Sequence, residues 1–148
     1  MLTTDSVAWN LATTFAPELR GTTCAGGHDQ LRVRGTVNLC GATLLVTLLT
    51  NFTAVHGDTF VLIDNDSTDA IIGTFAGLPE GTLFSASDRV FRISYTGGTG
   101  NDVQLTRTPA PSSELAGDTV LRNGLRQFSG TGVPGASYVI EASTNLIQ

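Results

Sequence analysis

The stretch DQLRVRGTVNL, residues 29–39, alternates apolar and polar side chains. Its apolar residues fall on one face of an extended chain and its polar residues on the other: Leu31, Val33, Val37 and Leu39 against Arg32, Arg34, Thr36 and Asn38. A period of two is the pattern of a β-strand with one buried face. We therefore predict a strand here, with its apolar face in the core.

Further strands are predicted on the C-terminal side of this stretch. After Gly41 the alternation continues in residues 44–48, and strand-like runs follow at residues 57–64, 71–78, 89–95 and 101–106. Turn-forming residues separate these runs. On the N-terminal side, residues 11–19 could form no more than a turn or two of helix, because Pro17 and several threonines interrupt them. The chain is predicted to be all-β.

The composition fits this fold class and narrows the classes of partner. Only 14% of the 148 residues are charged and all eight basic residues are arginine, which suits a Thr- and Gly-rich β protein. The net charge of −5 argues against nucleic acid or an anionic membrane as a partner, because both attract basic clusters. The longest apolar run, residues 42–49, is too short to span a bilayer, and the first residues do not resemble a signal peptide.

The polar run TRTPAPSSELAG, residues 106–117, marks a domain boundary, because its prolines and serines are typical of a linker. We predict a β-rich segment over residues 1–106, a linker over 107–117 and an incomplete β-module over 118–148. The module has candidate strands near residues 119–121, 126–128 and 138–142, which are too few to bury a core alone. We therefore expect this C-terminal tail to pair with a second copy of the chain.

Three stretches carry a resemblance to a known group of proteins: HDQLRVRGTVNLCGATLLVTLL (28–49), GDTFVLIDNDSTDAIIGTFAGLPEGTLF (57–84) and FRISYTGGTGNDVQLT (91–106). Together they resemble the C-terminal segment of bacterial autotransporter-type surface proteins, which carry β-strand repeats. The tail FSGTGVPGASYVIEASTNLIQ (128–148) is similar to the first part of a small β-sandwich module that follows such segments. The chain departs from the pattern at His28, where an aromatic residue is more usual, and at Cys40, where a small residue is expected.

The resemblance implies the end of a short right-handed β-solenoid, or β-helix, with hairpins; a β-sandwich is the alternative fold. It also implies an extracellular or cell-surface segment with a structural or adhesive role, and it supplies no catalytic residues. Two other function classes remain open from the residues. One is a small hydrolase acting on an ester or a polysaccharide. The other is a module that binds surface glycans through aromatic side chains, for which Trp9, Tyr95 and Tyr138 are the candidates.

Two loops raise the question of a calcium site. The sequence GGTGND, residues 97–102, resembles one copy of a calcium-binding repeat, but such repeats need a stacked neighbour to complete six or more oxygen ligands. Asp102 would be a ligand of such a site, but we predict instead a glycine-rich hairpin turn that Asn101 and Asp102 cap. Asp64, Asp66 and Asp69 are the better cation ligands by spacing, although a hydrated loop accounts for them as well. No other cofactor is indicated.

Two further sets of residues could carry chemistry. Cys24 and Cys40 could form one disulfide in an oxidising compartment, or they could be two free, buried thiols. The pairs His28–Asp29 and His56–Asp58 could serve a serine-based hydrolase, but the chain has no G-x-S-x-G sequence. We expect both histidines to be exposed turn residues.

Overall fold

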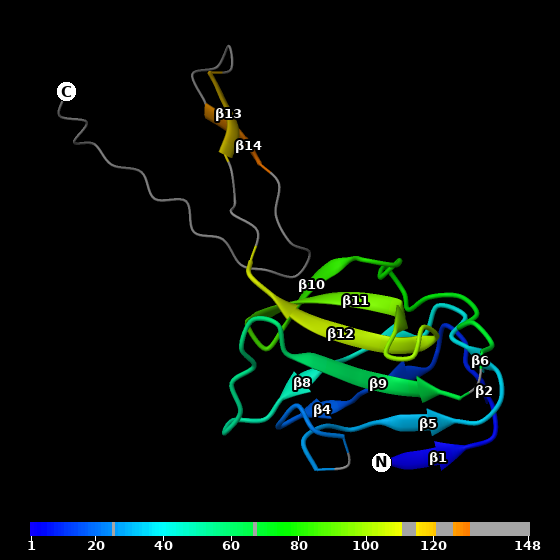
Figure 1. The fold of residues 1–148 in the computed structure, drawn as a ribbon. Helices are drawn as coiled ribbons and strands as arrows, with labels where there is room; N and C mark the ends of the chain where they lie inside the picture. Colours follow the sequence, from blue (N-terminus) through cyan, green and yellow to red (C-terminus); the bar gives the residue numbers. More distant parts are fainter. Residues whose placement is uncertain (25, 67, 111–114, 121–125, 131–148) are drawn as a thin grey trace.

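A computed structural model of the chain describes residues 1–24, 26–66, 68–110, 115–120 and 126–130, and these contain strands and no helix (Figure 1). The prediction of an all-β chain is confirmed. The strands are β1 (Leu2–Thr4), β2 (Val7–Ala8), β3 (Thr14–Phe15), β4 (Glu18–Leu19), β5 (Leu31–Val33), β6 (Val37–Asn38), β7 (Thr43–Leu44), β8 (Thr47–Leu48), β9 (Thr59–Asn65), β10 (Leu83–Ala86), β11 (Arg89–Gly97), β12 (Asp102–Thr108), β13 (Leu115–Val120) and β14 (Arg126–Gly130).

A mixed six-stranded sheet with the order β1-β5-β9-β12-β11-β10 organises the molecule (Figure 1). Its first three strands are parallel, and its last three form an antiparallel meander that pairs with β9 through β12. Three two-stranded parallel sheets accompany it, namely β2-β6, β3-β7 and β4-β8, and β13 pairs with β14 in an antiparallel hairpin. The strand β1 is therefore one edge of the large sheet and β10 is the other.

The parallel pairs share one register. Residues 2–19, which we call the first pass, and residues 31–48, the second pass, are paired at nearly constant offsets: 29 from Leu2 to Leu31, 30 from Val7 to Val37, 29 from Thr14 to Thr43, and 29 from Glu18 to Thr47. A third pass begins with β9 beside β5 and continues to a bridge between Asn38 and Ile72. The chain thus makes three stacked passes, each paired in parallel with the one before it.

The core lies inside these passes, where the alternation predicted for residues 31–39 is confirmed. Leu31, Val33, Val37 and Leu39 are buried, while Arg32 and Arg34 are exposed. Aromatic rings pack against one another in two groups. One group contains Trp9, Phe15, Phe75 and Tyr95, and the other contains His28, Phe52, Phe60, Phe84 and Phe91. The second group connects the parallel strands to the antiparallel meander.

Several strand bounds differ from the prediction. The single strand expected over residues 29–39 is two short strands, β5 and β6, because the chain bends at Gly35, where a Cβ atom would lie 2.6 Å from the Asp5 carbonyl oxygen. Residues 44–48 likewise fall into β7 and β8. The strand predicted at 71–78 is wrong: only isolated bridges occur there, since Gly73 and Gly77 adopt positive φ angles of 75° and 69°.

Elements on either side of these strands were not predicted. The strands β1 to β4 and β10 are missing from the sequence prediction. β12 ends at Thr108 and β13 begins at Leu115, so both reach into the residues predicted as a linker. The strands expected near residues 119–121 and 126–128 correspond to β13 and β14, and the one near 138–142 lies outside the described residues.

Candidate functional site

The loop between β11 and β12 turns the chain, as predicted, and Asp102 anchors it. One carboxylate oxygen of Asp102 accepts a hydrogen bond from the Asn65 amide at 2.8 Å. The other accepts from the amide of Thr99 at 2.7 Å and from its hydroxyl at 3.1 Å. Gly98 has a φ of 52°, and a Cβ atom there would collide with this carboxylate. The glycine and the aspartate therefore fit one another, and only 2% of Asp102 is exposed.

Two buried asparagines, Asn65 and Asn101, tie Asp66 and Asp69, which follow β9, to this turn. The Asn65 side-chain amide donates to the Asp69 carbonyl at 2.7 Å. The Asn101 side-chain amide donates to the same carbonyl at 3.1 Å and to the Asp66 carbonyl at 3.3 Å. We call Asn65, Asp69, Thr99, Asn101 and Asp102 the loop cluster. It joins the end of the parallel strand β9 to the hairpin β11–β12.

The four aspartates proposed as cation ligands have different surroundings. Asp64 forms an ion pair with Arg32 at 2.8 Å, because the parallel register places the two residues side by side. This hydrogen bond and the negative charge of Asp64 raise the pKa of the Arg32 guanidinium. Asp66 is exposed, and the Asp102 carboxylate is already engaged by backbone and hydroxyl donors. In the part of the chain that the structure describes, no three His, Cys, Asp or Glu side chains are grouped to hold a metal ion.

Two oxygen atoms of the loop cluster do retain free acceptor capacity. The Asn65 Oδ1 and Asp69 Oδ2 atoms are buried and have no hydrogen-bond partner among the described residues. Two such oxygens are far fewer than the six to eight ligands that calcium takes. The loop cluster is therefore built mainly to hold two loops together through the hydrogen bonds of Asp102 and the asparagines.

Calcium is accordingly expected to have little effect on stability. Thermal melts of the full chain with calcium and with a chelator should give melting temperatures within a few degrees of each other. A large stabilisation by calcium that disappears in Asp69→Asn would contradict this expectation. Asp66→Asn, which changes an exposed carboxylate outside the cluster, is the matched control.

The two histidines considered as catalytic bases have different surroundings. His28 is buried, contrary to the expectation of an exposed turn residue, and only 4% of it is exposed. Its ring nitrogens lie 3.4 Å from the Gly21 carbonyl and 3.2 Å from the Val61 carbonyl, and its ring packs edge-on against Phe60. It fills the core position that an aromatic residue would take. The Asp29 carboxylate instead accepts from the Glu18 amide at 3.1 Å.

His56 is exposed, as expected, in a turn that Asp58 stabilises. The Asp58 carboxylate accepts a hydrogen bond from the Val55 amide at 2.8 Å. Asp58 thus has a structural partner in the Val55 amide. The pair gives no support to a serine-based hydrolase.

The two cysteines are exposed and free, so the structure contains no disulfide between them and they are not buried thiols. The backbone of Cys24 forms an isolated β-bridge with that of His28, whereas the backbone of Cys40 lies against Gly73 of the third pass. Each is therefore held by a different part of the fold.

Tyr95 is a buried polar residue that the sequence did not single out for this role. Its hydroxyl accepts a hydrogen bond from the Phe75 amide at 2.9 Å and donates one to the Leu78 carbonyl at 2.6 Å. Burial raises the pKa of Tyr95 to about 12, the Phe75 hydrogen bond opposes this change, and the charge of Glu80 adds to it. Because the ring is 7% exposed, Tyr95 is not available as a glycan-binding platform.

The raised pKa of Tyr95 predicts a loss of stability in alkali. Since the folded pKa lies above the ordinary value of 10.0, the stabilising contribution is complete below pH 10 and is lost as the pH rises toward about 12. Tyr95→Phe should remove this pH dependence while lowering stability at neutral pH by about 1–3 kcal/mol, because the buried Phe75 amide loses its acceptor. Urea unfolding of both proteins across this pH range is the measurement. An unchanged pH profile in the variant would show that another group is responsible.

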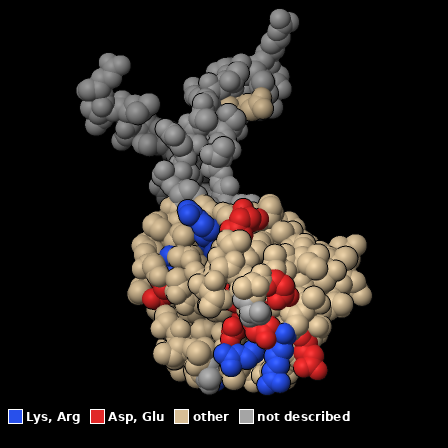
Figure 2. All heavy atoms as spheres, turned by 45° about the vertical axis from the view of Figure 1, so that its right-hand side comes forward, with Lys and Arg blue, Asp and Glu red and all other residues tan. Residues whose placement is uncertain are grey.

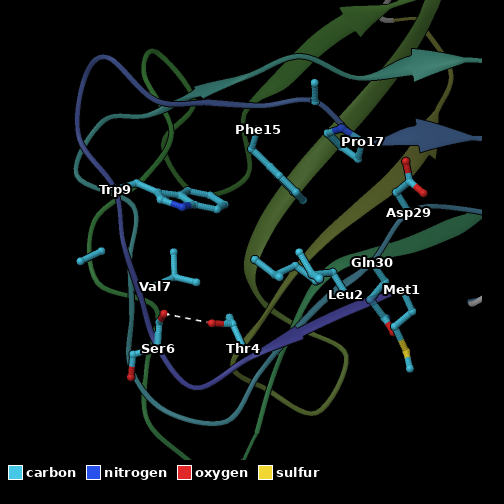
Figure 3. Close-up of a pocket in the computed structure, with 13 residues that line it drawn as sticks. Met1, Leu2, Thr4, Ser6, Val7, Trp9, Phe15, Pro17, Asp29 and Gln30 are labelled. Atoms are coloured by element: carbon cyan, nitrogen blue, oxygen red, sulfur yellow. Dashed lines mark hydrogen bonds between the residues drawn. The ribbon is translucent and has the colours of Figure 1, made fainter.

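An open hollow of about 620 Å³ lies beside the first pass. Figure 3 shows Leu2, Val7, Trp9 and Phe15 around it, with Thr4 and Ser6 at one end. The Trp9 and Phe15 rings are 5.2 Å apart, and Trp9 also packs 6.1 Å from Phe75. The sequence prediction missed this feature because it placed no strands in residues 2–19.

Charge is distributed sparsely on the surface. Figure 2 shows uncharged residues over most of one face, with acidic and basic side chains next to each other at its lower edge. Across the residues described, there is no helix of the length and apolarity needed to cross a bilayer.

Comparison of the chain with protein-family models, with curated proteins and with solved structures finds no match in any of the three.

Proposed function

We propose that the chain is a non-enzymatic segment of an extracellular bacterial surface protein, folded as the end of a short right-handed β-solenoid and serving as a scaffold or adhesin. The observation that carries this proposal is the register of the parallel pairs, with offsets of 29 or 30 residues at all four positions. A constant offset is what a coil with equal turns produces. The first, second and third passes are then successive turns.

The β-sandwich alternative accounts less well for this register. Sandwiches are built from antiparallel sheets, whereas the first and second passes pair in parallel throughout. The antiparallel meander β10–β12 follows the third pass and covers the edge of β9. In the solenoid it serves as the cap that solenoids require at their ends.

The extracellular and structural or adhesive role draws support from the resemblance of residues 28–49, 57–84 and 91–106 to autotransporter-type surface proteins. The surroundings of the candidate catalytic residues also favour it. His28 is a core residue, and Asp29 and Asp58 each accept a backbone hydrogen bond. Self-association through residues 118–148 remains part of this proposal, and the hairpin β13–β14 is the portion of that tail which the structure describes.

Adhesion of particles coated with the full chain tests the proposal. Coated beads should be retained on abiotic or glycan-coated surfaces more strongly than beads coated with heat-denatured chain, and His56→Ala should behave like the wild type. Equal retention of native and denatured chain would rule out an adhesive role.

A substrate screen tests the rival hydrolase. The full chain should release no product from p-nitrophenyl esters or from polysaccharides above the uncatalysed rate. Turnover that His56→Ala abolishes, and that the exposed control Val55→Ala retains, would overturn the non-enzymatic assignment.

A further inference from the structure

Two arginines are neighbours at one end of the antiparallel meander. Phe91 of β11 is paired with Arg107 of β12, and Arg89 precedes Phe91 by two residues. Side chains two residues apart on a strand share a face, and so do directly opposed side chains on neighbouring strands. Arg89 and Arg107 are therefore diagonal neighbours on the face of Phe91, at a spacing of about 7–8 Å that long side chains can span.

Within the described part of the chain, these two guanidinium groups make few hydrogen bonds, although each carries five N–H donors. Nη1 of Arg107 donates to the Val90 carbonyl at 3.1 Å. Nη1 of Arg89 donates to the Asp88 carbonyl at 3.3 Å. The Arg107 Nε atom is buried and has no hydrogen-bond partner among the described residues. Because a buried charged donor without an acceptor is costly, this nitrogen favours a ligand that accepts hydrogen bonds.

The two positive charges also lack a neutralising carboxylate. Asp88 adjoins Arg89 in the sequence, and the Asp58 carbonyl accepts a hydrogen bond from the Arg107 amide. Among the described residues, neither aspartate forms an ion pair with the arginines, and the Asp58 carboxylate is engaged by the Val55 amide. Burial and the positive charge of Arg89 lower the pKa of Arg107, as expected for like charges that are close together and partly desolvated.

These features indicate an anion with several acceptor oxygens as the ligand. Two guanidinium groups supply two positive charges, which a doubly charged oxyanion neutralises, and each planar guanidinium can donate parallel hydrogen bonds to two oxygens of such an anion. A polyanion such as a nucleic acid is disfavoured, because the whole chain has a net charge of −5 and only eight basic residues. The arrangement therefore suits a small oxyanion.

We propose that Arg89 and Arg107 form a binding site for a small, doubly charged oxyanion of the sulfate or phosphate class. The anion accepts hydrogen bonds from Nε of Arg107 and from the guanidinium of Arg89, so it bridges β11 and β12 (Figure 1). The turn before β11 is attached to the second pass, because the Leu48 amide donates to the Ser87 hydroxyl at 3.1 Å. The bound anion thus stabilises the end of the meander, and the site does not depend on the proposed adhesive role.

Titration of the full chain with sodium sulfate, followed through backbone amide chemical shifts, tests the site. Shifts at residues 88–91 and 106–108 should saturate, whereas sodium chloride at equal ionic strength should cause no saturable change. Arg89→Gln and Arg107→Gln should each weaken sulfate binding at least roughly tenfold, because each removes a charged donor. Arg92→Gln is the matched control. Arg92 is an exposed arginine on the opposite face of β11, so this variant should bind sulfate like the wild type.

Thermal unfolding gives a second readout. Sulfate should raise the melting temperature of the wild type more than that of Arg89→Gln, because a ligand that binds only the folded chain stabilises it. The general stabilisation of folded proteins by sulfate affects both equally. In chloride at low ionic strength, Arg89→Gln should melt no lower than the wild type, since it removes a like-charge contact.

The absence of saturable sulfate binding by the wild type would overturn the proposal, and so would equal weakening by Arg92→Gln and Arg89→Gln. Glu114, which lies outside the described residues, is the first acidic residue after Arg107 in the sequence. Sulfate binding that appears only in Glu114→Gln would also overturn the proposal, because it would identify a carboxylate of the chain itself as the occupant.

Discussion

Replacement of Phe60 by alanine is expected to lower the free energy of unfolding by about 3–5 kcal/mol, the usual range for removing a fully buried aromatic ring. Phe60 is 0% exposed, and its ring lies 5.6 Å from His28, 6.0 Å from Phe52 and 6.1 Å from Phe91. His28 belongs to the loop before the second pass, and Phe91 belongs to the antiparallel meander. The substitution would thus open a cavity where the parallel and antiparallel parts of the fold meet.

Urea unfolding of the full chain measures this effect as a shift of the denaturation midpoint. Equal m-values for the wild type and the variant would show that both expose the same surface on unfolding. Val55→Ala is the matched control, because Val55 is 61% exposed and surface changes of this kind usually stay within about 0.5 kcal/mol. A loss below about 1 kcal/mol in Phe60→Ala would show that the ring is not packed as the structure describes.

The alternation of residues 31–39 could be predicted because it depends on the local chain alone. A period of two decides which side chains face inward wherever one face is buried. The bend at Gly35 could not be predicted in the same way. It is caused by the close approach of Asp5 and Ser6 from the first pass, and that approach exists only after the two passes have stacked.

The strands of the first pass were missed for a related reason. β2, β3 and β4 contain two residues each, which is too short for a period of two to be recognised. Their pairing partners lie 29 or 30 residues away, so the information that defines them is in the repeat and not in the segment. A search for self-similarity at that spacing is the signal that could have found them.

The site residues also divide into those whose role depends on sequence neighbours and those whose role depends on distant contacts. The role of Asp102 in its turn was predictable, because the glycines and the carboxylate are neighbours in sequence. The ion pair of Asp64 with Arg32 was not, since it depends on the parallel pairing of β5 with β9. Burial of His28 and Tyr95 likewise follows from contacts with Val61 and Phe75, which lie 33 and 20 residues away.

Removal of the Asp102 side chain is expected to have the second largest effect. Asp102→Ala should lower the free energy of unfolding by about 2–4 kcal/mol, because it eliminates hydrogen bonds to a charged acceptor and leaves a buried donor unsatisfied. That donor is the Asn65 amide, in a residue that is 1% exposed. The Thr99 amide also loses its acceptor, but Thr99 is exposed and can bond to water.

Asp102→Asn and Asp66→Ala make the test specific to this arrangement. The asparagine keeps one acceptor oxygen for the Asn65 amide, so its loss of stability should be smaller than that of the alanine variant. Asp66→Ala removes an exposed carboxylate and should change stability by less than about 0.5 kcal/mol. If Asp102 connects β9 to the β11–β12 turn, urea unfolding should show the largest loss of stability in Asp102→Ala, a smaller loss in Asp102→Asn and the smallest in Asp66→Ala. Equal stability of Asp102→Ala and Asp66→Ala would mean that the turn is held by its glycines and backbone alone.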